Sequence, residues 1–563
     1  MTLTPPRTGD TTIPPARTSA DQPDTDGGKP ASQRFLARAA FVTVALSLAG
    51  ALLGLGRDQA LAHLFGAGSD TDAFLVAWTV PEFAATLLIE DGLAFALVPA
   101  FSAAVARRAQ GGTGDPVHAL VRSTLPRLSM AFVAVSALLV CGAPYLVEVL
   151  APGLPDPRFA VDCTRLTGTC VLTFGLAGYC SAALRAHRRF VAPAAIYVAY
   201  NTAIITAMFV LGGRWGVRAA ATGVAVGGVL MIVTQLPALL RQLHRRKKPD
   251  APDPADAADT TMSGTATLAD MAANRHVMNL ALILAVLLFA LCRQSQVLIE
   301  RFLASTLPSG SISHLNYAQK VAQMPMVLAL MLCTVTFPVV AQALAEGDTE
   351  RARDRVERDL RAVSCVVLLG TAAVVACAPQ LVHLLFQRGA FTAEDTAATA
   401  AVMRVYALGL LGQALVGALV RSYFSAGRPT WYPVTAMAAG IVVTAWLGAA
   451  TVGSWGVLGI AAANAIGITV TALVLLYGMG ARSVPIRTRQ VLAEMSKPLR
   501  AAVVACGVGG FLASRVDSPA LGLAAGGTAV TAVFLLLAWL LGVQGFAPAL
   551  RTVTRRRPHA RIR

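Results

Sequence analysis

Charged residues are scarce in this chain of 563 residues: Asp, Glu, Lys and Arg make up 14% of it, against roughly a quarter in a soluble protein. Its nine cysteines are scattered singly, which excludes a disulfide framework and a cysteine-rich zinc site. The eight histidines do not cluster, and no glycine-rich phosphate-binding loop occurs. We therefore expect no enzymatic activity and no cofactor.

Apolar residues are abundant instead, at 55% of the chain with a mean hydropathy of +0.62. Apolar runs of about 20 residues, the length that crosses a bilayer as a helix, recur along the sequence. The sequence predicts an all-α integral membrane protein with about fourteen transmembrane helices. The predicted spans are 35–56, 73–105, 126–150, 160–184, 191–213, 217–240, 277–303, 313–343, 362–386, 396–420, 431–451, 456–479, 499–515 and 520–543.

The formal net charge of +17 is distributed unevenly. Basic clusters such as "RAHRR" from Arg185, "RRKK" from Arg245 and "RTVTRRRPHARIR" at the end follow even-numbered spans. Positive charge concentrates in the cytoplasmic loops of membrane proteins, so this pattern predicts a multi-pass protein of the bacterial plasma membrane with both termini in the cytoplasm. Because topology accounts for the basic clusters, we do not expect a nucleic-acid partner.

Composition divides the chain into six parts. The first residues are rich in Pro, Thr, Asp and Gly, contain no apolar signal segment and predict a disordered tail. The predicted parts are a cytoplasmic tail (1–33), an N-terminal lobe of six spans (34–245), a flexible cytoplasmic linker (246–274), a C-terminal lobe of six spans (275–482), two further spans (483–545) and a basic cytoplasmic tail (546–563).

The two six-span lobes look like copies of one unit. Trp215-Gly216-Val217 recurs as Trp455-Gly456-Val457, and Arg165 recurs as Arg404, each about 240 residues on. Six is an even number, so both copies enter the membrane in the same direction. They should then be related by a pseudo-two-fold axis along the membrane normal, as in transporters built from parallel repeats. This arrangement favours alternating access through a central cavity.

Charged residues inside the spans indicate where that cavity is, because an ionisable group at membrane depth needs a partner or a polar cavity. The cations inside the spans are Arg165, Arg293, Arg301, Lys320 and Arg404, and Arg57 stands at the end of the first span, next to Asp58. The acids at or near membrane depth are Asp72, Glu82, Glu90, Asp91, Asp162 and Glu300.

Two patterns predict an anion-binding cavity. Arg57 and Arg301 occupy matched places in the two copies, and a planar guanidinium can bind two phosphate oxygens at once. Asn316, Lys320 and Gln323 share one helix face by their spacing of four and three residues, with Gln319 at its edge. The predicted substrate-binding residues are Arg57, Asp72, Arg301, Asn316, Gln319, Lys320 and Gln323.

Each charge also has a purely structural interpretation. Arg165 and Arg404 can pair with Asp162 or with interfacial lipid, and Arg293 can form an internal salt bridge. Arg301 can pair with adjacent acids and pin the helix end, Lys320 can snorkel to the interface, and Asp72 can cap the second span.

Several segments resemble one family. "GLGRDQALAHLFGAGSDTDAFLVAWTVPE" (54–82), "SGSISHLNYAQKVAQMPMVLAL" with "TFPVVAQALAEGD" (309–348), and "LFQRGAFTAEDT" (385–396) resemble segments of the lipid II flippase family MurJ/MviN, in the expected order. The resemblance covers most of residues 35–480. It implies the fourteen-helix fold of the multidrug/oligosaccharidyl-lipid/polysaccharide exporters, in which cavity arginines meet the diphosphate of undecaprenyl-diphosphate-linked peptidoglycan precursor.

The chain departs from the family pattern in the cavity. Two arginines of the family are replaced by Ala51 and by Ala84 or Ala85, and the acids that flank the eighth-span cation are replaced by Gln319 and Gln323. We therefore expect Lys320 to be less neutralised than its family counterpart and more available to a diphosphate.

The resemblance also bears on coupling. Some members bind sodium through an acid of the seventh span, a place that Glu300 takes here. The eleventh and twelfth spans offer only a few threonines and Asn464 as further ligands, which argues against sodium coupling. Membrane potential or a cation gradient is the expected driving force.

Three classes of function are compatible with these features. The first is a flippase for lipid II, the peptidoglycan precursor, or for another polyprenyl-linked glycan. The second is a cation-coupled drug exporter of the same fold, against which the cationic cavity argues. The third is a non-transporting scaffold for cell-wall synthesis proteins. The expected partners are a lipid-linked glycan diphosphate, membrane lipids and cell-wall synthesis proteins.

Overall fold

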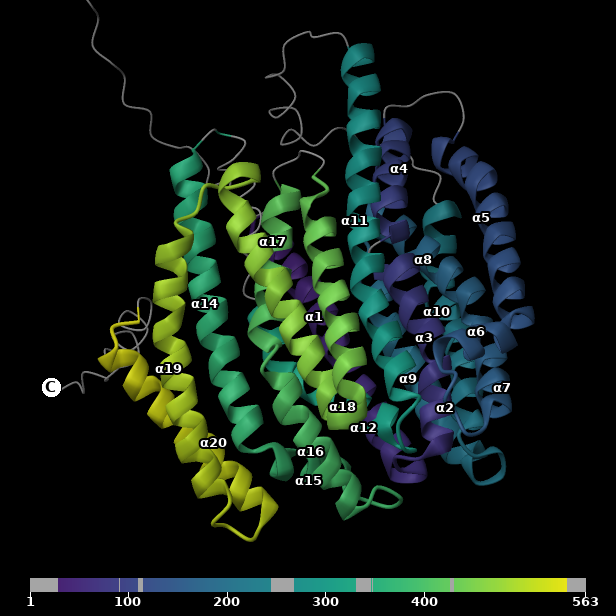
Figure 1. Ribbon diagram of the computed structural model, residues 1–563. Helices are drawn as coiled ribbons and strands as arrows, with labels where there is room; N and C mark the ends of the chain where they lie inside the picture. The colour runs from purple at the N-terminus through teal and green to yellow at the C-terminus, as the bar shows by residue number, and fades with distance from the viewer. Residues whose placement is uncertain are drawn as a thin grey trace, which may run out of the picture.

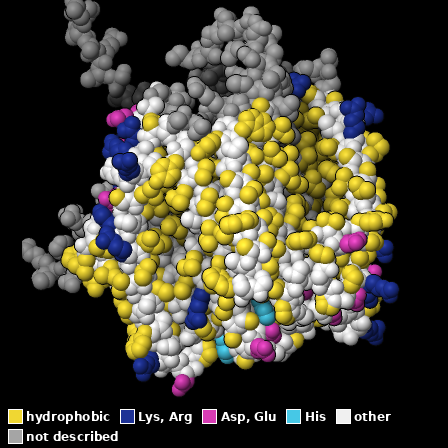
Figure 2. All heavy atoms as spheres, viewed as in Figure 1, with side chains coloured by type: hydrophobic (Ala, Val, Ile, Leu, Met, Phe, Trp, Pro, Cys, Tyr) yellow, Lys and Arg dark blue, Asp and Glu magenta, His cyan; other side chains and the backbone are white. Residues whose placement is uncertain are grey.

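The computed structural model describes residues 29–90, 92–109, 115–244, 268–330, 346, 348–425 and 430–543. Within these ranges the protein is helical and contains no strand. Nine helical stretches of the described chain are long and apolar enough to cross a membrane, or ten if the bent pair 393–407 and 410–424 counts as one. The number fourteen stays a prediction. Apolar side chains cover most of the visible face, and charges gather towards its margins (Figure 2).

The first half of the chain, up to His244, forms ten α-helices and one π-helix (Figure 1). These are α1 (Lys29–Phe65), α2 (Ser69–Ala77), α3 (Thr79–Ala84), the π-helix η1 (Ala85–Glu90), α4 (Gly92–Ala109), α5 (Pro116–Cys141), α6 (Ala143–Leu150), α7 (Pro157–Gly168), α8 (Cys170–Ala186), α9 (Val191–Trp215) and α10 (Arg218–His244).

The second half of the chain, from Leu268, follows with α11 (Leu268–Ala304), α12 (Ser311–Ala322), α14 (Thr349–Ala376), α15 (Ala378–Phe386), α16 (Ala393–Ala407), α17 (Leu410–Ser425), α18 (Tyr432–Arg482), α19 (Thr488–Ala513) and α20 (Pro519–Leu540). Residues 1–28 of the predicted N-terminal tail, the C-terminal tail, most of the predicted linker, and residues 331–343 of the eighth predicted span lie outside the described residues. Residues 29–33 and 268–274, predicted as tail and linker, belong to α1 and α11.

Helix breaks recur at matched places in the two halves. The third predicted span is broken at Gly142, between α5 and α6, and the ninth is broken at Cys377, between α14 and α15. In both cases the new helix has a proline in its first turn, where a missing N–H costs no hydrogen bond. The fourth and tenth predicted spans are broken at Thr169 and after Ala407. Shared breaks are what an internal duplication predicts.

Two glycines at matched places reverse the chain. Gly216 ends α9 with a φ of 57°, and Gly456 interrupts α18 with a φ of 54°, a left-handed conformation that glycine adopts without steric cost. Gly440 faces Thr471, so the two parts of α18 lie antiparallel. The single element α18 therefore contains the predicted spans 431–451 and 456–479.

The second predicted span, 73–105, is broken near its start. Pro81 lies in the first turn of α3, where proline is tolerated, and the break falls at Trp78 between α2 and α3. The chain then passes through the π-helix η1 before α4 begins. In this irregular segment the carboxylate of Glu82 contacts Arg301 and Lys320 of the second half of the chain, and that of Glu90 contacts Tyr197 of α9.

The two halves of the chain meet at one end of the helices, which we call the closed end. Its turns are residues 66–68, 151–156, 305–310 and 387–392. There the carbonyl of His63 accepts a hydrogen bond from Ala390 N at 2.9 Å. The backbone N–H of Gly153 donates to Ser305 Oγ at 3.4 Å. Helices α19 and α20 stand outside this arrangement, at the edge of the molecule beside α14 (Figure 1).

Candidate functional site

A cavity of about 820 Å³ lies between the two halves of the chain. Helices α1, α3, α8 and α9 with η1 form one wall, and α11, α12, α16, α17 and α18 form the other. Its charged lining residues are Arg57, Glu82, Glu90, Arg293, Glu300, Lys320 and Arg421. Its uncharged polar lining residues include Thr86, Tyr197, Tyr200, Asn201, Gln294, Gln296, Gln319, Gln323, Tyr406, Gln413 and Asn464. The cavity therefore suits a large polar molecule that carries negative charge.

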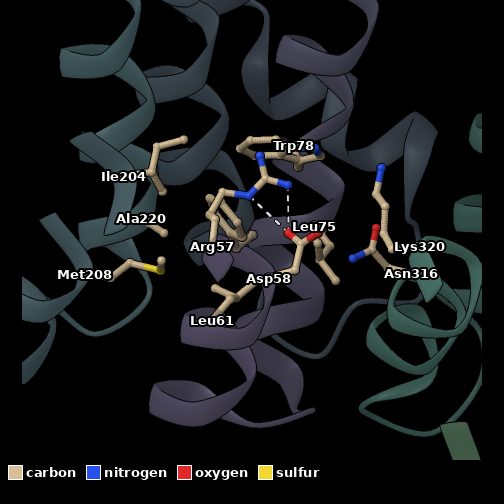
Figure 3. A pocket seen from close by; sticks show the side chains of 11 residues that line it. Arg57, Asp58, Leu61, Leu75, Trp78, Ile204, Met208, Ala220, Asn316 and Lys320 are labelled. Atoms are coloured by element: carbon tan, nitrogen blue, oxygen red, sulfur yellow. Dashed lines mark hydrogen bonds and ion pairs between the residues drawn. The ribbon is translucent and has the colours of Figure 1, made fainter. Parts of the chain in front are cut away.

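Arg57 stands on the wall that α1 provides and is held from three sides. Its guanidinium donates to Asp58 Oδ1 at 2.7 and 3.0 Å and to Asn201 Oδ1 at 3.2 Å. It also lies over the ring of Trp78, 4.2 Å from the centroid, a cation–π contact. These partners fix the group in one orientation beside Lys320 and Asn316 of α12 (Figure 3).

Glu82 of α3 joins the two halves of the chain through ion pairs. Its Oε2 accepts from Arg301 of α11 at 3.1 Å, and its Oε1 lies 3.4 Å from Lys320 Nζ of α12. Arg57 acts on the same carboxylate at longer range. Three cations predicted from the sequence thus converge on one acid, and the pairing of Lys320 with Glu82 was not predicted from the sequence. The sequence could not pair residues 238 positions apart.

Arg301 does not line the cavity, which corrects its expected position as a partner of Arg57. It is buried, and its guanidinium donates to Thr79 Oγ1 as well as to Glu82. The alternative predicted from the sequence, in which Arg301 pairs with an adjacent acid, is not observed either, because the ion-pair partner Glu82 belongs to α3.

Asp72 also lies outside the cavity lining. It is buried at the closed end, where its carboxylate accepts from the backbone N–H groups of Gly310 (2.7 Å) and Ser313 (2.8 Å) and from Ser313 Oγ (2.6 Å). It therefore caps α12 of the second half of the chain rather than its own helix. Neither the substrate role nor the capping role predicted from the sequence is the one observed.

The polar face predicted on α12 is correct. Gln319, Lys320 and Gln323 line the cavity, and Asn316 lines a small adjoining pocket with Arg57 and Lys320. The two glutamines donate to the hydroxyl of Tyr406 at 2.8 and 3.3 Å. These amides therefore brace the cavity wall that α12 and α16 share.

Glu300 lines the cavity and is buried, with Asn464 Nδ2 donating to its Oε1. The sequence singled out both residues. In the described part of the chain, no group of three or more His, Cys, Asp and Glu side chains is arranged to hold a metal ion. The role of Glu300 in ion coupling stays a prediction.

Three basic residues predicted from the sequence lie apart from the ion pairs of Glu82. Arg293 is exposed to the cavity, and no ion pair involves it within the described residues, so its predicted internal salt bridge is absent. Asp162 pairs with Arg218 at 2.8 Å and not with Arg165, which is exposed. Arg404 donates to the carbonyl of Val375 at 3.3 Å.

Sequence reasoning missed several lining residues. Glu82 and Glu90 appeared only among the acids at membrane depth, and Arg421 was not singled out. Tyr197, whose hydroxyl donates to Glu90 Oε1 at 2.8 Å, and Tyr406 were overlooked. A signal existed for Glu82, since an acid inside a span requires a cationic partner. The tyrosines carried no such signal.

Comparison with known proteins points to one family. The family model described as "Lipid II flippase MurJ" matches residues 61–523. A lipid II flippase MurJ of Burkholderia cenocepacia is 27% identical over 459 residues, covering 80% of this chain and 84% of the relative. A probable lipid II flippase MurJ of Vibrio cholerae is 24% identical over 498 residues, covering 84% of this chain and 89% of the relative.

Solved structures agree on the fold. A structure of lipid II flippase MurJ in an inward closed conformation superposes with a TM-score of 0.69 at 18% identity, covering 89% of this chain and 98% of that one. An inward-facing multidrug resistance MATE transporter of the MOP superfamily gives a TM-score of 0.60 at 14% identity, covering 81% of this chain and 99% of that one.

Proposed function

Since the chain belongs to the lipid II flippase MurJ family, we propose that it moves undecaprenyl-diphosphate-linked peptidoglycan precursor from the inner to the outer leaflet of the bacterial plasma membrane. The observation that carries this function is the cavity of about 820 Å³ between the two halves of the chain, with Arg57 and Lys320 facing it. A diphosphate is a strong acceptor for guanidinium and ammonium donors.

The geometry supports alternating access. The halves of the chain are tied at the closed end by Asp72 and by the contact between His63 and Ala390. The head group enters the cavity while the prenyl tail stays in lipid. Rocking of the two halves then breaks these contacts and opens the cavity at that end.

With both termini cytoplasmic, as the basic clusters predict, the closed end faces outwards. Membrane potential or a cation gradient, with Glu300 as the candidate coupling acid, drives the cycle.

Arg57 has the role of a fixed anchor in this mechanism. Asp58, Asn201 and Trp78 hold its guanidinium, so little side-chain entropy is lost when a phosphate binds. Lys320 supplies a second donor from the opposite wall. Donors on both walls let one diphosphate contact both halves of the chain.

Complementation tests this function. The gene should rescue a strain depleted of its own lipid II flippase. Arg57→Ala and Lys320→Ala should each reduce the rescue at least tenfold while membrane protein levels stay equal. Rescue that survives both substitutions would remove these residues from the binding site. Failure of the wild-type protein to rescue despite normal expression would contradict lipid II as the substrate.

Another polyprenyl-linked glycan is the second candidate, favoured by the departures at Ala51, Gln319 and Gln323. Transport assays in proteoliposomes with different lipid-linked glycans separate the two. A drug exporter for cations is disfavoured, because Arg57, Arg293, Lys320 and Arg421 line the same cavity. We also propose that the chain acts without enzymatic catalysis, and that cell-wall synthesis enzymes that consume the product are its protein partners.

A further inference from the structure

The carboxylate of Glu82 has its two oxygens on two different cations. Arg301 approaches Oε2 at 3.1 Å, and Lys320 approaches Oε1 at 3.4 Å. Glu82 belongs to the first half of the chain, and both cations belong to the second. An acid at this depth, on the cavity wall, is costly unless it is compensated, so its position asks for an explanation beyond helix packing.

The two cations differ in how firmly they are held. The side chain of Arg301 is only 7% exposed and also donates to Thr79 Oγ1, so it is fixed below the cavity surface. The side chain of Lys320 is 31% exposed, faces the cavity and has the longer contact. Lys320 can therefore leave Glu82 while Arg301 continues to neutralise the carboxylate. If Arg301 were displaced from Glu82 instead, its buried guanidinium would be left without an ion-pair partner, which is costly.

Glu82 is also the single carboxylate within ion-pair distance of Lys320 among the described residues. The neighbouring positions on α12 carry Gln319 and Gln323, whose amides are bound to Tyr406. No acid of α12 can take over when Glu82 is displaced. The ammonium of Lys320 therefore pairs either with Glu82 or with an anion in the cavity.

We propose that Glu82 is a built-in counter-ion for Lys320, which the diphosphate of the substrate replaces, and that it sets the preference of the cavity for diphosphate over monophosphate. This inference rests on the proposed function. A monophosphate carries about −1.5 to −2 charges at pH 7 on one phosphoryl group, so it gains less Coulomb energy than a diphosphate when it replaces the Glu82 carboxylate. A diphosphate brings more charge and more oxygens, so it still gains when it displaces Glu82.

Direct binding tests the proposal. Geranylgeranyl diphosphate and geranylgeranyl monophosphate are titrated calorimetrically into the full-length protein in nanodiscs of neutral lipid. We expect Glu82→Gln to tighten diphosphate binding roughly three- to tenfold. Monophosphate binding should tighten more, so the ratio of the two dissociation constants falls. Unchanged or weaker diphosphate binding by Glu82→Gln would overturn the proposal.

Glu90→Gln is the matched control. Glu90 lines the same cavity and loses the same charge, but it accepts from Tyr197 and forms no ion pair within the described residues. We expect less than a twofold change for it. Equal tightening by both variants would show a general charge effect and would contradict a specific exchange at Lys320.

A double-mutant cycle localises the effect to Lys320. In a Lys320→Ala background, Glu82→Gln should no longer tighten diphosphate binding. A full gain in that background would overturn the assignment.

Thermal unfolding verifies that each variant is folded. Glu82→Asp keeps the charge, so its dissociation constant for the diphosphate should stay within about twofold of the wild-type value even if Glu82→Gln unfolds. Wild-type protein that binds no diphosphate would contradict the proposed function as well, whereas normal wild-type binding with unchanged Glu82→Gln would contradict this inference alone.

Discussion

At the scale of single residues, charge compensation across the two halves of the chain is the main feature of the site. Lys320, Arg301 and Glu82 come from three different helices, and each ion pair among them joins two helices. Arg57 is the exception, because Asp58 follows it directly in the sequence. Since the compensating acid is supplied from the opposite wall, the charge state of the cavity depends on how the two halves are placed.

Asp72 has the corresponding role at the closed end. It accepts three hydrogen bonds from residues of the second half of the chain and is buried. Charge-assisted bonds to backbone N–H groups are stronger than neutral ones. The Asp72 carboxylate therefore stabilises the contact between the two halves of the chain at the closed end through three charge-assisted hydrogen bonds.

We predict that Asp72→Asn weakens the closed end. Asparagine has one acceptor oxygen, and its NH₂ group would face backbone donors, so about 2–4 kcal/mol of interaction is lost. A lower Tm and faster labelling of an introduced Ser305→Cys by a thiol reagent would be measured. Asp70→Asn, at an exposed position of the same helix, is the control and should change neither. Equal effects of the two variants would contradict the role of Asp72.

At the scale of elements, the π-helix η1 is fitted closely to its neighbour α8. A Cβ atom at Gly178 of α8 would lie 1.9 Å from the carbonyl oxygen of Leu88 in η1. Only glycine permits this approach of two backbones. The contact fixes the irregular segment that places Glu82 and Glu90 in the cavity wall.

We predict that Gly178→Ala destabilises the protein by about 1–3 kcal/mol, because the added methyl group forces α8 and η1 apart. Gly507→Ala in α19 is the matched control, since a Cβ there meets no atom within 4 Å. Helix propensity alone should make that change neutral or favourable by up to about 1 kcal/mol. Thermal unfolding in detergent compares the two, and a Gly178→Ala variant as stable as Gly507→Ala would refute the packing argument.

At the scale of the whole molecule, the protein is closed at one end and hollow in the middle. At the closed end, polar contacts between the two halves accompany a buried apolar cluster to which both halves contribute, including Leu61, Tyr317 and Phe391. The hydrogen bonds of Asp72 across the closed end must break when the two halves separate there. This is the arrangement expected of a transporter whose conformations differ by a few kcal/mol.

We predict that a covalent link at the closed end blocks transport without blocking binding. His63→Cys with Ala390→Cys, in a protein without other cysteines, places thiols where the two halves contact each other. Cross-linking with a short bifunctional thiol reagent should abolish flipping of lipid-linked substrate in proteoliposomes, and cleavage of the linker should restore it. Diphosphate binding should persist. Transport by the cross-linked protein would contradict alternating access, and Ser181→Cys with Gln235→Cys, both within the first half of the chain, is the control.

Much of the site was predictable where a helix face carries the information. The spacing of Gln319, Lys320 and Gln323 placed these side chains on one face, and the structure directs that face to the cavity. The repeat predicted matched reversals, which Gly216 and Gly456 provide. Predictions that needed a partner from another helix were less successful. Arg301 and Asp72 were assigned to the cavity, and both are buried outside it.

The sequence by itself determined the membrane class, the duplication and the polar face of α12, because hydropathy, internal similarity and helical period are properties of local stretches. Only the tertiary structure decided which charges compensate each other. Glu82 meets Arg301 and Lys320 because α3, α11 and α12 converge, and the energy of a charge at membrane depth depends on that convergence rather than on neighbours in sequence.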